Sequence, residues 1–391
     1  MASPNLPDDI IENILSRLPA KRFICVSKAW DKLITSHAFA QLHLSRSKGD
    51  QLVLGRYGYH YSFLHDVPFD LDVNGDCPLP IRVCDGIVWG SCDGLLCISC
   101  RTSQTPDYTL FLWNPSTREC KQLPPPNLTS LRPAFALGYN PSTMDYEILG
   151  MCSDFHCYNM NNEIEGMCDS LGDPGSVVDL YTLKENSWQT ISSHIPYSIG
   201  SPTSRVLLHS KHHWNAFQCA LRHISILSYD IKDRTFQEIP LPKFEYDPPC
   251  DAIWIDEWGN FQMSPPPDLE DEGPDIVLTT LYDCLCVCRP HRKQVEAWIM
   301  RVYGDAESWT KLFSIETEFG TNSLTPLFCN TDGAILMLNN NDGLALYDRK
   351  DGSLRILSRY HINERCSFQV KTYKQSMVAL GIGSYNAETL A

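Results

Sequence analysis

Three histidines lie close together in the segment LLHSKHHW, at His209, His212 and His213. Imidazole nitrogens bind zinc and act as general bases, so this group is the best candidate in the chain for metal or acid–base chemistry. A metal site needs a further ligand group, and none accompanies these residues in the sequence. Histidines that flank a strand turn are more often surface or hydrogen-bonded residues, and we interpret the three histidines in that way.

Cysteines are the second candidate ligand type, with 17 in the chain. Cys284, Cys286 and Cys288 alternate in DCLCVC, a spacing that points all three to one face of a strand. Cys97 and Cys100 have the CxxC spacing, but a zinc site usually has a second pair at similar spacing, and none stands out. In a reducing compartment, cysteines act as small buried apolar residues. We therefore predict neither a metal nor a cofactor.

Catalytic motifs are also missing, because the sequence contains no GxSxG, HExxH or Walker-type phosphate loop. A glycosidase would need two acids that converge in space, and a sequence does not show such convergence. We predict no catalytic residues, and an enzyme is the less favoured alternative.

The charge of the chain bears on its partners and its location. The chain has 391 residues and a formal net charge of -15, which repels phosphate backbones and anionic lipid, so we predict neither nucleic acid nor a membrane as a partner. Asp8, Asp9 and Glu12 break the basic and apolar layout of a secretory signal, and no apolar stretch reaches the roughly 18 residues of a membrane span. We expect a soluble intracellular protein, in the cytoplasm and/or the nucleus.

The elements that would position side chains fall into two classes, and the helical class comes first. Residues 5–44 are the only strongly helical stretch, and Leu18-Pro19 ends its first helix because a residue before proline is pushed out of helical geometry. A module of about 40 residues is at the lower limit for independent folding, so it needs a neighbour. The apolar positions at helical spacing are Ile10, Ile11, Ile14, Leu15 and Leu18 in the first segment and Val26, Trp30, Leu33 and Ile34 in the second.

From about residue 50 the apolar period changes from about 3.6 to 2, which is typical of strands. A unit then recurs, consisting of an apolar strand that ends in an aromatic residue, a polar turn, and a strand that closes on a bulky apolar residue. The aromatic residues are 68, 48, 69 and 49 residues apart, near the length of a kelch-type blade once insertions at 152–176 and 264–275 are allowed. These aromatic residues are Trp113, Tyr181, Tyr229, Trp298 and Tyr347.

The sequence thus predicts a small all-α module over residues 1–48, followed by a large all-β domain over residues 49–391. We expect the second domain to be a kelch-like β-propeller of about six blades, at roughly 50 residues per blade. Strand-like stretches near residues 52 and 378 are expected to meet and close the propeller. The paired glycines of ordinary kelch repeats are absent, so the blade prediction depends on spacing and aromatic residues.

Two sets of motifs carry a family resemblance. The runs LPDDIIENILSRLPAK, CVSKAWDKLI and HAFAQLHL resemble the F-box of plant F-box proteins. The later runs CDGLLCI, LFLWNPSTREC, ALGYNPSTMDYEIL and EAWIMRVYGDAESWTKL resemble the F-box-associated interaction domain, which follows the F-box in a large plant family that includes the S-locus F-box group. The resemblance covers nearly the whole chain, with both motif sets in the expected order.

The resemblance implies a receptor rather than a catalyst. An F-box binds a Skp-type adaptor, which is attached to a cullin, while the second domain holds a target protein for ubiquitination and degradation. The residues expected to contact the adaptor are Leu6, Pro7, Ile10, Ile14, Leu15, Leu18, Pro19, Val26, Trp30, Leu33 and Ile34. Trp30 is expected to contribute most because a large aromatic buries the most area, and some of the others must pack inside the module. The resemblance identifies neither the target nor the residues that bind it.

One stretch departs from the family pattern. Between Lys21 and Arg22 the F-box pattern normally has about three more residues, including apolar ones. Losing three residues from a continuous helix removes about 4.5 Å of rise and rotates everything downstream by about 60°. The alternative function is therefore a protein-binding module whose degenerate F-box no longer binds the adaptor.

Overall fold

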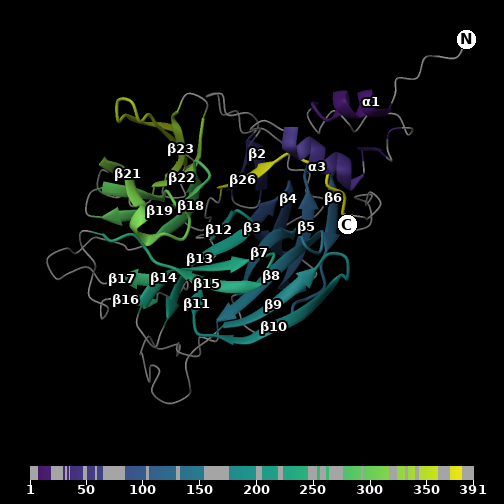
Figure 1. Cartoon of the computed structure of the whole chain (residues 1–391), viewed down its shortest axis with the longest axis horizontal. Coiled ribbons are helices and arrows are strands. Elements are labelled where there is room, and N and C mark those ends of the chain that lie inside the picture. The colour runs from purple at the N-terminus through teal and green to yellow at the C-terminus, as the bar shows by residue number, and fades with distance from the viewer. Residues whose placement is uncertain are drawn as a thin grey trace, which may run out of the picture. The chain divides into compact units, whose positions relative to one another are not determined.

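A computed structural model gives the fold of the chain (Figure 1). The chain divides into two compact units, with Met1–Pro125 and Ile362–Ala391 in unit 1 and Pro126–His361 in unit 2. The residues that the structure describes are 8–18, 30, 33–34, 36–46, 51–57, 60–64, 84–102, 105–128, 133–153, 176–199, 205–218, 223–244, 253–255, 261–263, 276–291, 294–316, 324–330, 333–339, 343–359 and 370–380.

The helices that the structure describes with full bounds are α1 (Asp8–Leu15) and α3 (His37–Arg46), both in unit 1. Ser36 caps α3, because its hydroxyl oxygen accepts a hydrogen bond from the Phe39 amide at 3.2 Å. Trp30, Leu33 and Ile34 are also helical, so the described residues of the predicted helical stretch include helical segments. None of the helices in the described ranges is long and apolar enough to cross a membrane.

Unit 1 holds two antiparallel sheets among its described residues, one of three strands in the order β2-β1-β26 and one of four strands in sequence order. Pairing of β1 with β26 joins residues from the two ends of the β domain. The strands of the first sheet are β1 (Gln51–Tyr57), β2 (His60–Leu64) and β26 (Val370–Lys374). The strands of the second sheet are β3 (Cys84–Cys92), β4 (Leu95–Thr102), β5 (Thr105–Asn114) and β6 (Glu119–Gln122).

The described residues of unit 2 form four larger antiparallel sheets and one hairpin. The first sheet consists of β7 (Ala134–Asn140), β8 (Asp145–Ser153), β9 (Ser176–Thr182) and β10 (Ser187–Ile195). The second consists of β11 (Ser198–Ile199), β12 (Arg205–Leu208), β13 (Lys211–Gln218), β14 (His223–Asp230) and β15 (Thr235–Ile239). The hairpin consists of β16 (Ile253–Ile255) and β17 (Phe261–Met263).

The chain then continues in unit 2 with the last two of these sheets, each of four strands. One consists of β18 (Val277–Leu281), β19 (Cys284–His291), β20 (Gln294–Met300) and β21 (Trp309–Glu316), with the 3-10 turn η3 (Ala306–Ser308) before its last strand. The other consists of β22 (Leu324–Cys329), β23 (Ile335–Asn339), β24 (Gly343–Tyr347) and β25 (Leu354–Arg359).

The repeat unit found in the sequence corresponds to the last two strands of each sheet that has four or more strands. Four of the hairpins between those strands end in a residue with positive φ, at Arg118, Asn186, Arg234 and Gly352, and the amide of each donates to the carbonyl four residues earlier at 2.8 or 2.9 Å. The recurrent aromatic residues all lie in the next-to-last strand of their sheet: Trp113 in β5, Tyr181 in β9, Tyr229 in β14, Trp298 in β20 and Tyr347 in β24. The predicted all-β repeat array is confirmed.

The predicted number of blades is wrong, because the described residues form five sheets of four or more strands and not six. The recurring aromatic residues give the right count, one for each sheet of four or more strands. The prediction of six spreads the length of the domain over blades of roughly 50 residues, which assigns nearly every residue to a blade. Residues 51–57, 60–64 and 370–374 instead form the three-stranded sheet, and the predicted insertion at 264–275 lies outside the described residues.

The predicted closure of the domain is correct for its first strand and shifted for its second. β1 pairs with β26 so that Leu52 lies opposite Tyr373. The stretch near residue 378 is therefore not the pairing strand, and residues 375–380 follow β26 without strand structure. Their main chain bonds instead to side chains at the turn between β5 and β6.

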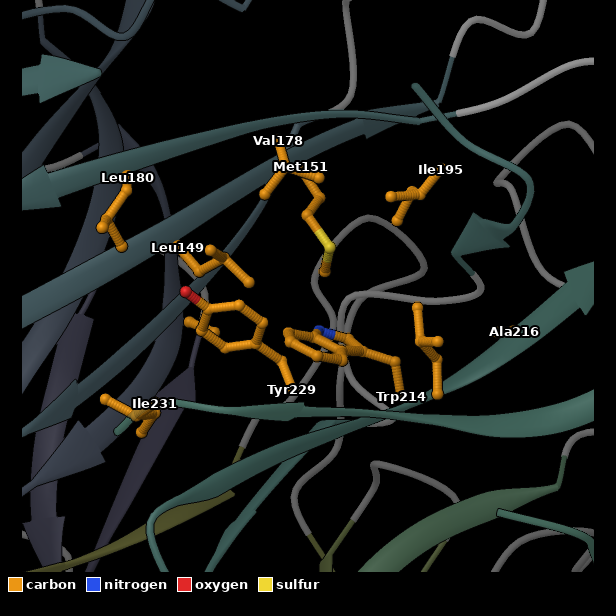
Figure 2. Packing of buried hydrophobic residues seen from close by; sticks show 11 residues of the cluster. Leu149, Met151, Val178, Leu180, Ile195, Trp214, Ala216, Tyr229 and Ile231 are labelled. Carbon is orange, nitrogen blue, oxygen red and sulfur yellow. The ribbon is translucent and has the colours of Figure 1, made fainter. Parts of the chain in front are cut away.

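The core of unit 2 is formed where neighbouring sheets face one another. Figure 2 shows Trp214 and Tyr229 of one sheet pointing toward Leu149, Met151 and residues of β9 in the sheet before it. Close packing of large aromatics against branched and thioether side chains removes much apolar area from water. Each Å² of apolar area buried in this way stabilises the fold by roughly 25 cal/mol. Cys286 and Cys288 share one buried cluster, as the sequence analysis expects, whereas Cys284 at the start of the same strand is half-buried.

Candidate functional site

Helix α1 presents apolar side chains to two different environments. Ile11 and Leu15 are 8% and 5% exposed and belong to the core, whereas Ile10 and Ile14 are 42% and 50% exposed. Ile10 and Ile14 are four residues apart, so they are neighbours on one side of the helix. An isolated exposed apolar residue is ordinary, but two adjacent isoleucines on a short helix form a ridge suited to a partner surface.

The C-terminal end of α1 is fixed to α3 by hydrogen bonds within unit 1. The His43 ring nitrogen Nε2 lies 2.9 Å from the carbonyl oxygen of Leu18. The Arg46 guanidinium donates to the Asn13 carbonyl at 3.3 Å and to the Asn13 side-chain oxygen at 3.1 Å, and it also bonds the Ser16 hydroxyl. These bonds hold the two helices together without using the side chains of Ile10 and Ile14.

The other side chains predicted to bind the adaptor differ in burial. Leu15 and Ile34 are buried, so their first role is to pack the module. Leu18, Trp30 and Leu33 are half-buried and retain surface for a partner. Four further predicted contact residues lie outside the described residues: Leu6, Pro7, Pro19 and Val26. The shortened stretch at Lys21 and Arg22 also lies outside them.

The three histidines separate into different environments. His209 is on the turn between β12 and β13, with its Nε2 atom 3.1 Å from the Asp283 carboxylate. His213 is buried, and its Nε2 atom lies 2.8 Å from the Tyr303 hydroxyl, which is itself 3.0 Å from the Ser228 hydroxyl. One histidine is at the surface and another is hydrogen-bonded, as interpreted from the sequence. The partners Tyr303 and Ser228 carry no sequence motif that would have identified them.

Burial keeps the two inner histidines uncharged. It lowers the pKa of His212 to about 3, and the charge of the nearby Arg205 acts in the same direction. Burial also lowers the pKa of His213 to about 4. Within the described part of the chain, no group of three or more histidine, cysteine, aspartate or glutamate side chains is arranged to hold a metal ion. The geometry therefore supports structural roles for His212 and His213.

Comparison with known proteins identifies the family to which the chain belongs. The family described as the F-box associated beta propeller domain matches residues 87–380. The chain belongs to the plant F-box proteins with an F-box-associated domain. An F-box/kelch-repeat protein of Arabidopsis thaliana is 26% identical over 408 residues, covering 97% of this chain and 97% of the relative. The F-box protein CPR1 of the same plant is 28% identical, over 90% of this chain and 84% of the relative.

The solved structures that resemble this F-box protein share less of its sequence than the plant relatives do. An oligogalacturonate lyase in complex with manganese matches with a TM-score of 0.38 and 11% identity, over 77% of this chain and 71% of the lyase.

Proposed function

We propose that this F-box protein is the substrate-recognition subunit of a Skp-cullin-F-box ubiquitin ligase. Its N-terminal helices bind a Skp-type adaptor, through which it is attached to a cullin, and its β domain binds a target protein. The observation that carries the proposal is the exposed ridge of Ile10 and Ile14 on α1, beside the buried Ile11 and Leu15. Two adjacent half-exposed isoleucines exceed the single scattered apolar residues of an ordinary surface, and they offer apolar area that a partner can cover.

A receptor of this kind needs no catalytic side chain of its own. Binding a target near a ubiquitin-charged enzyme raises the local concentration of its lysines, and proximity alone can supply several kcal/mol toward a bimolecular reaction, on the order of 7 or more in favourable geometry. Two rigid binding surfaces therefore suffice. The buried and uncharged His212 and His213 agree with such a role.

Co-purification with a plant Skp-type adaptor tests the proposal. The wild-type chain is expected to retain the adaptor, and Trp30→Ala to retain much less of it, because a half-buried indole has area free for a partner. Val302→Ala is the control, since Val302 is 59% exposed and lies in unit 2, and it is expected to bind as the wild type does. Equal adaptor retention by Trp30→Ala and the wild type would count against the assigned contact surface.

The shortened stretch between Lys21 and Arg22 favours a second function, that of a protein-binding module that does not bind the adaptor. A chain with three apolar residues restored after Lys21 separates the two functions. Adaptor binding by the wild type supports the receptor. If only the chain with the restored residues binds the adaptor, the receptor function is wrong for the wild type. The protein would then be a module that sequesters a partner without ubiquitinating it.

An enzymatic role is tested in the same preparations. Hydrolase activity on generic substrates that persists in a chain with Trp30→Ala would support an enzymatic function, because such activity would not depend on adaptor binding. We also propose a location in the cytoplasm, the nucleus or both, which imaging of the fluorescently tagged chain in plant cells would test.

A further inference from the structure

The turn between β5 and β6 in unit 1 makes an unusual set of contacts. It contains the sequence Asn-Pro-Ser-Thr, and its polar side chains bond to main-chain atoms of residues about 260 positions later. We propose that this turn is a binding slot for the main chain of an extended peptide, and that the C-terminal segment 375–380 occupies it as an internal ligand. The segment that binds is thus part of the same chain.

Asn114 provides the donor of the slot. Its side-chain nitrogen Nδ2 donates to the Ser376 carbonyl at 3.2 Å and to the Val378 carbonyl at 2.8 Å. The other polar side-chain atom of Asn114, Oδ1, accepts from the amides of Ser116 at 2.8 Å and Thr117 at 3.4 Å, which fixes the orientation of the amide group. Asn114 is fully buried, so its bonds are shielded from competing water.

Ser116 and Glu119 provide the acceptors. The Ser376 amide donates to the Ser116 hydroxyl oxygen at 3.3 Å, and the Leu380 amide donates to the Glu119 carboxylate at 2.7 Å. The bonded residues are 376, 378 and 380, which is the alternate spacing at which an extended chain presents one edge. Burial raises the pKa of Glu119, while the bond from the Leu380 amide acts against that rise by favouring the carboxylate.

Gly94 lets the peptide approach closely. A Cβ atom on Gly94 would lie 2.6 Å from the Lys374 carbonyl oxygen and 2.3 Å from the Ser376 hydroxyl, and its φ of +81° already favours glycine. The segment itself is buried, with Ser376, Val378 and Leu380 all 5% exposed or less. Side-chain bonds to the main chain thus replace a strand ladder, which explains why residues 375–380 lack strand structure.

A second Asn-Pro-Ser-Thr turn in unit 2 shows what the same motif does elsewhere. Asn140 uses its Nδ2 atom to bond the Ile231 carbonyl at 2.9 Å, and its Oδ1 atom accepts from the Ser142 amide at 2.9 Å. Its companion carboxylate, Glu147, is bound by the Arg234 guanidinium at 2.7 Å. Both asparagines bond distant main chain, but of these two turns the one at Asn114 bonds several alternate residues of one segment.

Hydrogen exchange in the full-length chain tests the slot. Asn114→Asp replaces the Nδ2 donor by an oxygen that faces two carbonyls, so the amides of Ser376 and Leu380 are expected to exchange about tenfold faster or more. The matched control is Asn140→Asp, the same change in the other turn, which is expected to leave residues 376–380 as protected as in the wild type. Unchanged exchange of residues 376–380 in Asn114→Asp would overturn the proposal.

Peptide binding in trans separates a binding slot from mere packing. The double variant Ser376→Pro/Leu380→Pro of the full chain removes both amide donors and should release the segment. A labelled synthetic peptide, KQSMVALG (residues 374–381), is expected to bind this variant at least about tenfold more tightly than the wild type, because in the wild type the slot is occupied at a high effective concentration.

Adding Asn114→Asp to the double variant is expected to abolish peptide binding. Two results would contradict the slot: failure of the double variant to bind the peptide although its β sheets remain folded, or equal binding with and without Asn114→Asp. Either result would mean that residues 375–380 are simply packed against the rest of unit 1. This test is independent of adaptor binding, so it does not depend on the proposed function.

Discussion

At the scale of single residues, His212 and His213 are neighbours on β13 whose charge states are set by burial. The folded state holds both rings neutral, because burial lowers the pKa of His212 to about 3 and that of His213 to about 4. In an unfolded chain a histidine has a pKa near about 6.5 and takes up a proton below that pH. The unfolded state therefore binds more protons than the folded state in mildly acidic solution, so stability falls as pH falls.

We predict that acid destabilises the chain partly through His213. Between about pH 6.5 and pH 4 the free energy of unfolding should decline more steeply in the wild type than in His213→Gln, since glutamine takes up no proton. His213→Gln should also lower stability at neutral pH by about 1 kcal/mol, because the bond to the Tyr303 hydroxyl is weakened or lost. Urea unfolding at about pH 7, 5.5 and 4.5 measures both effects across that window, and parallel pH profiles would refute the account.

Residue types alone predict the histidine environments in outline but miss the role of Asn114. The motif NPST occurs twice in the sequence and by itself indicates only hairpin punctuation. Its added role depends on Ser376, Val378 and Leu380 lying opposite it, which is a contact across about 260 residues. Local spacing carries no information about so distant a partner, whereas the repetition of an asparagine before proline at the end of an apolar strand is an available hint.

At the scale of elements, the strand pairs of the β domain follow from short-range patterns. Apolar runs that end with an aromatic residue locate β5, β9, β14, β20 and β24, because these strands are buried along most of their length. Blade number is missed because insertions and the three-stranded sheet of β1, β2 and β26 add length without adding a repeat. Length therefore predicts a repeat count less well than the repeated residue does.

Close approach between β7 and its neighbours in unit 2 depends on Gly138. A Cβ atom at Gly138 would lie 2.3 Å from the Ile231 Cδ1 atom and 3.0 Å from the His212 Nε2 atom. We predict that Gly138→Ala lowers the free energy of unfolding by about 1–3 kcal/mol, because overpacking forces neighbours from their places. Gly90→Ala is the control on β3, where an added Cβ meets no atom within 4 Å, and its effect should be about 0.5 kcal/mol or less.

A double-mutant cycle identifies the clash at Gly138. Ile231→Val removes the Cδ1 atom, which should cost about 0.5–1.5 kcal/mol in the wild type but much less in a chain that already carries Gly138→Ala. Denaturant unfolding of the wild type, the two single variants and the double variant gives the coupling energy. Additive effects would show that Ile231 does not limit the space at Gly138.

At the scale of the whole molecule, the order of a helical module and a large β domain is predictable, because the apolar period changes near residue 50. The assignment of individual adaptor contacts is not. A stripe of apolar residues on a helix does not reveal which of them the module covers, and only the packing distinguishes the exposed Ile10 and Ile14 from the buried Ile11 and Leu15. The predicted boundary near residue 48 stays a prediction, because residues 47–50 lie outside the described residues.

The most direct test of the central claim is a calorimetric titration of the full-length chain with a purified plant Skp-type adaptor. We predict saturable binding that the double variant Ile10→Asp/Ile14→Asp weakens about 100-fold or more, because it puts two charges into an apolar contact. The variant should keep its fold, since both side chains are exposed, and Val302→Asp in unit 2 should bind as the wild type does. Equal affinity of the wild type and the Ile10/Ile14 variant, or no binding by the wild type, would contradict the account.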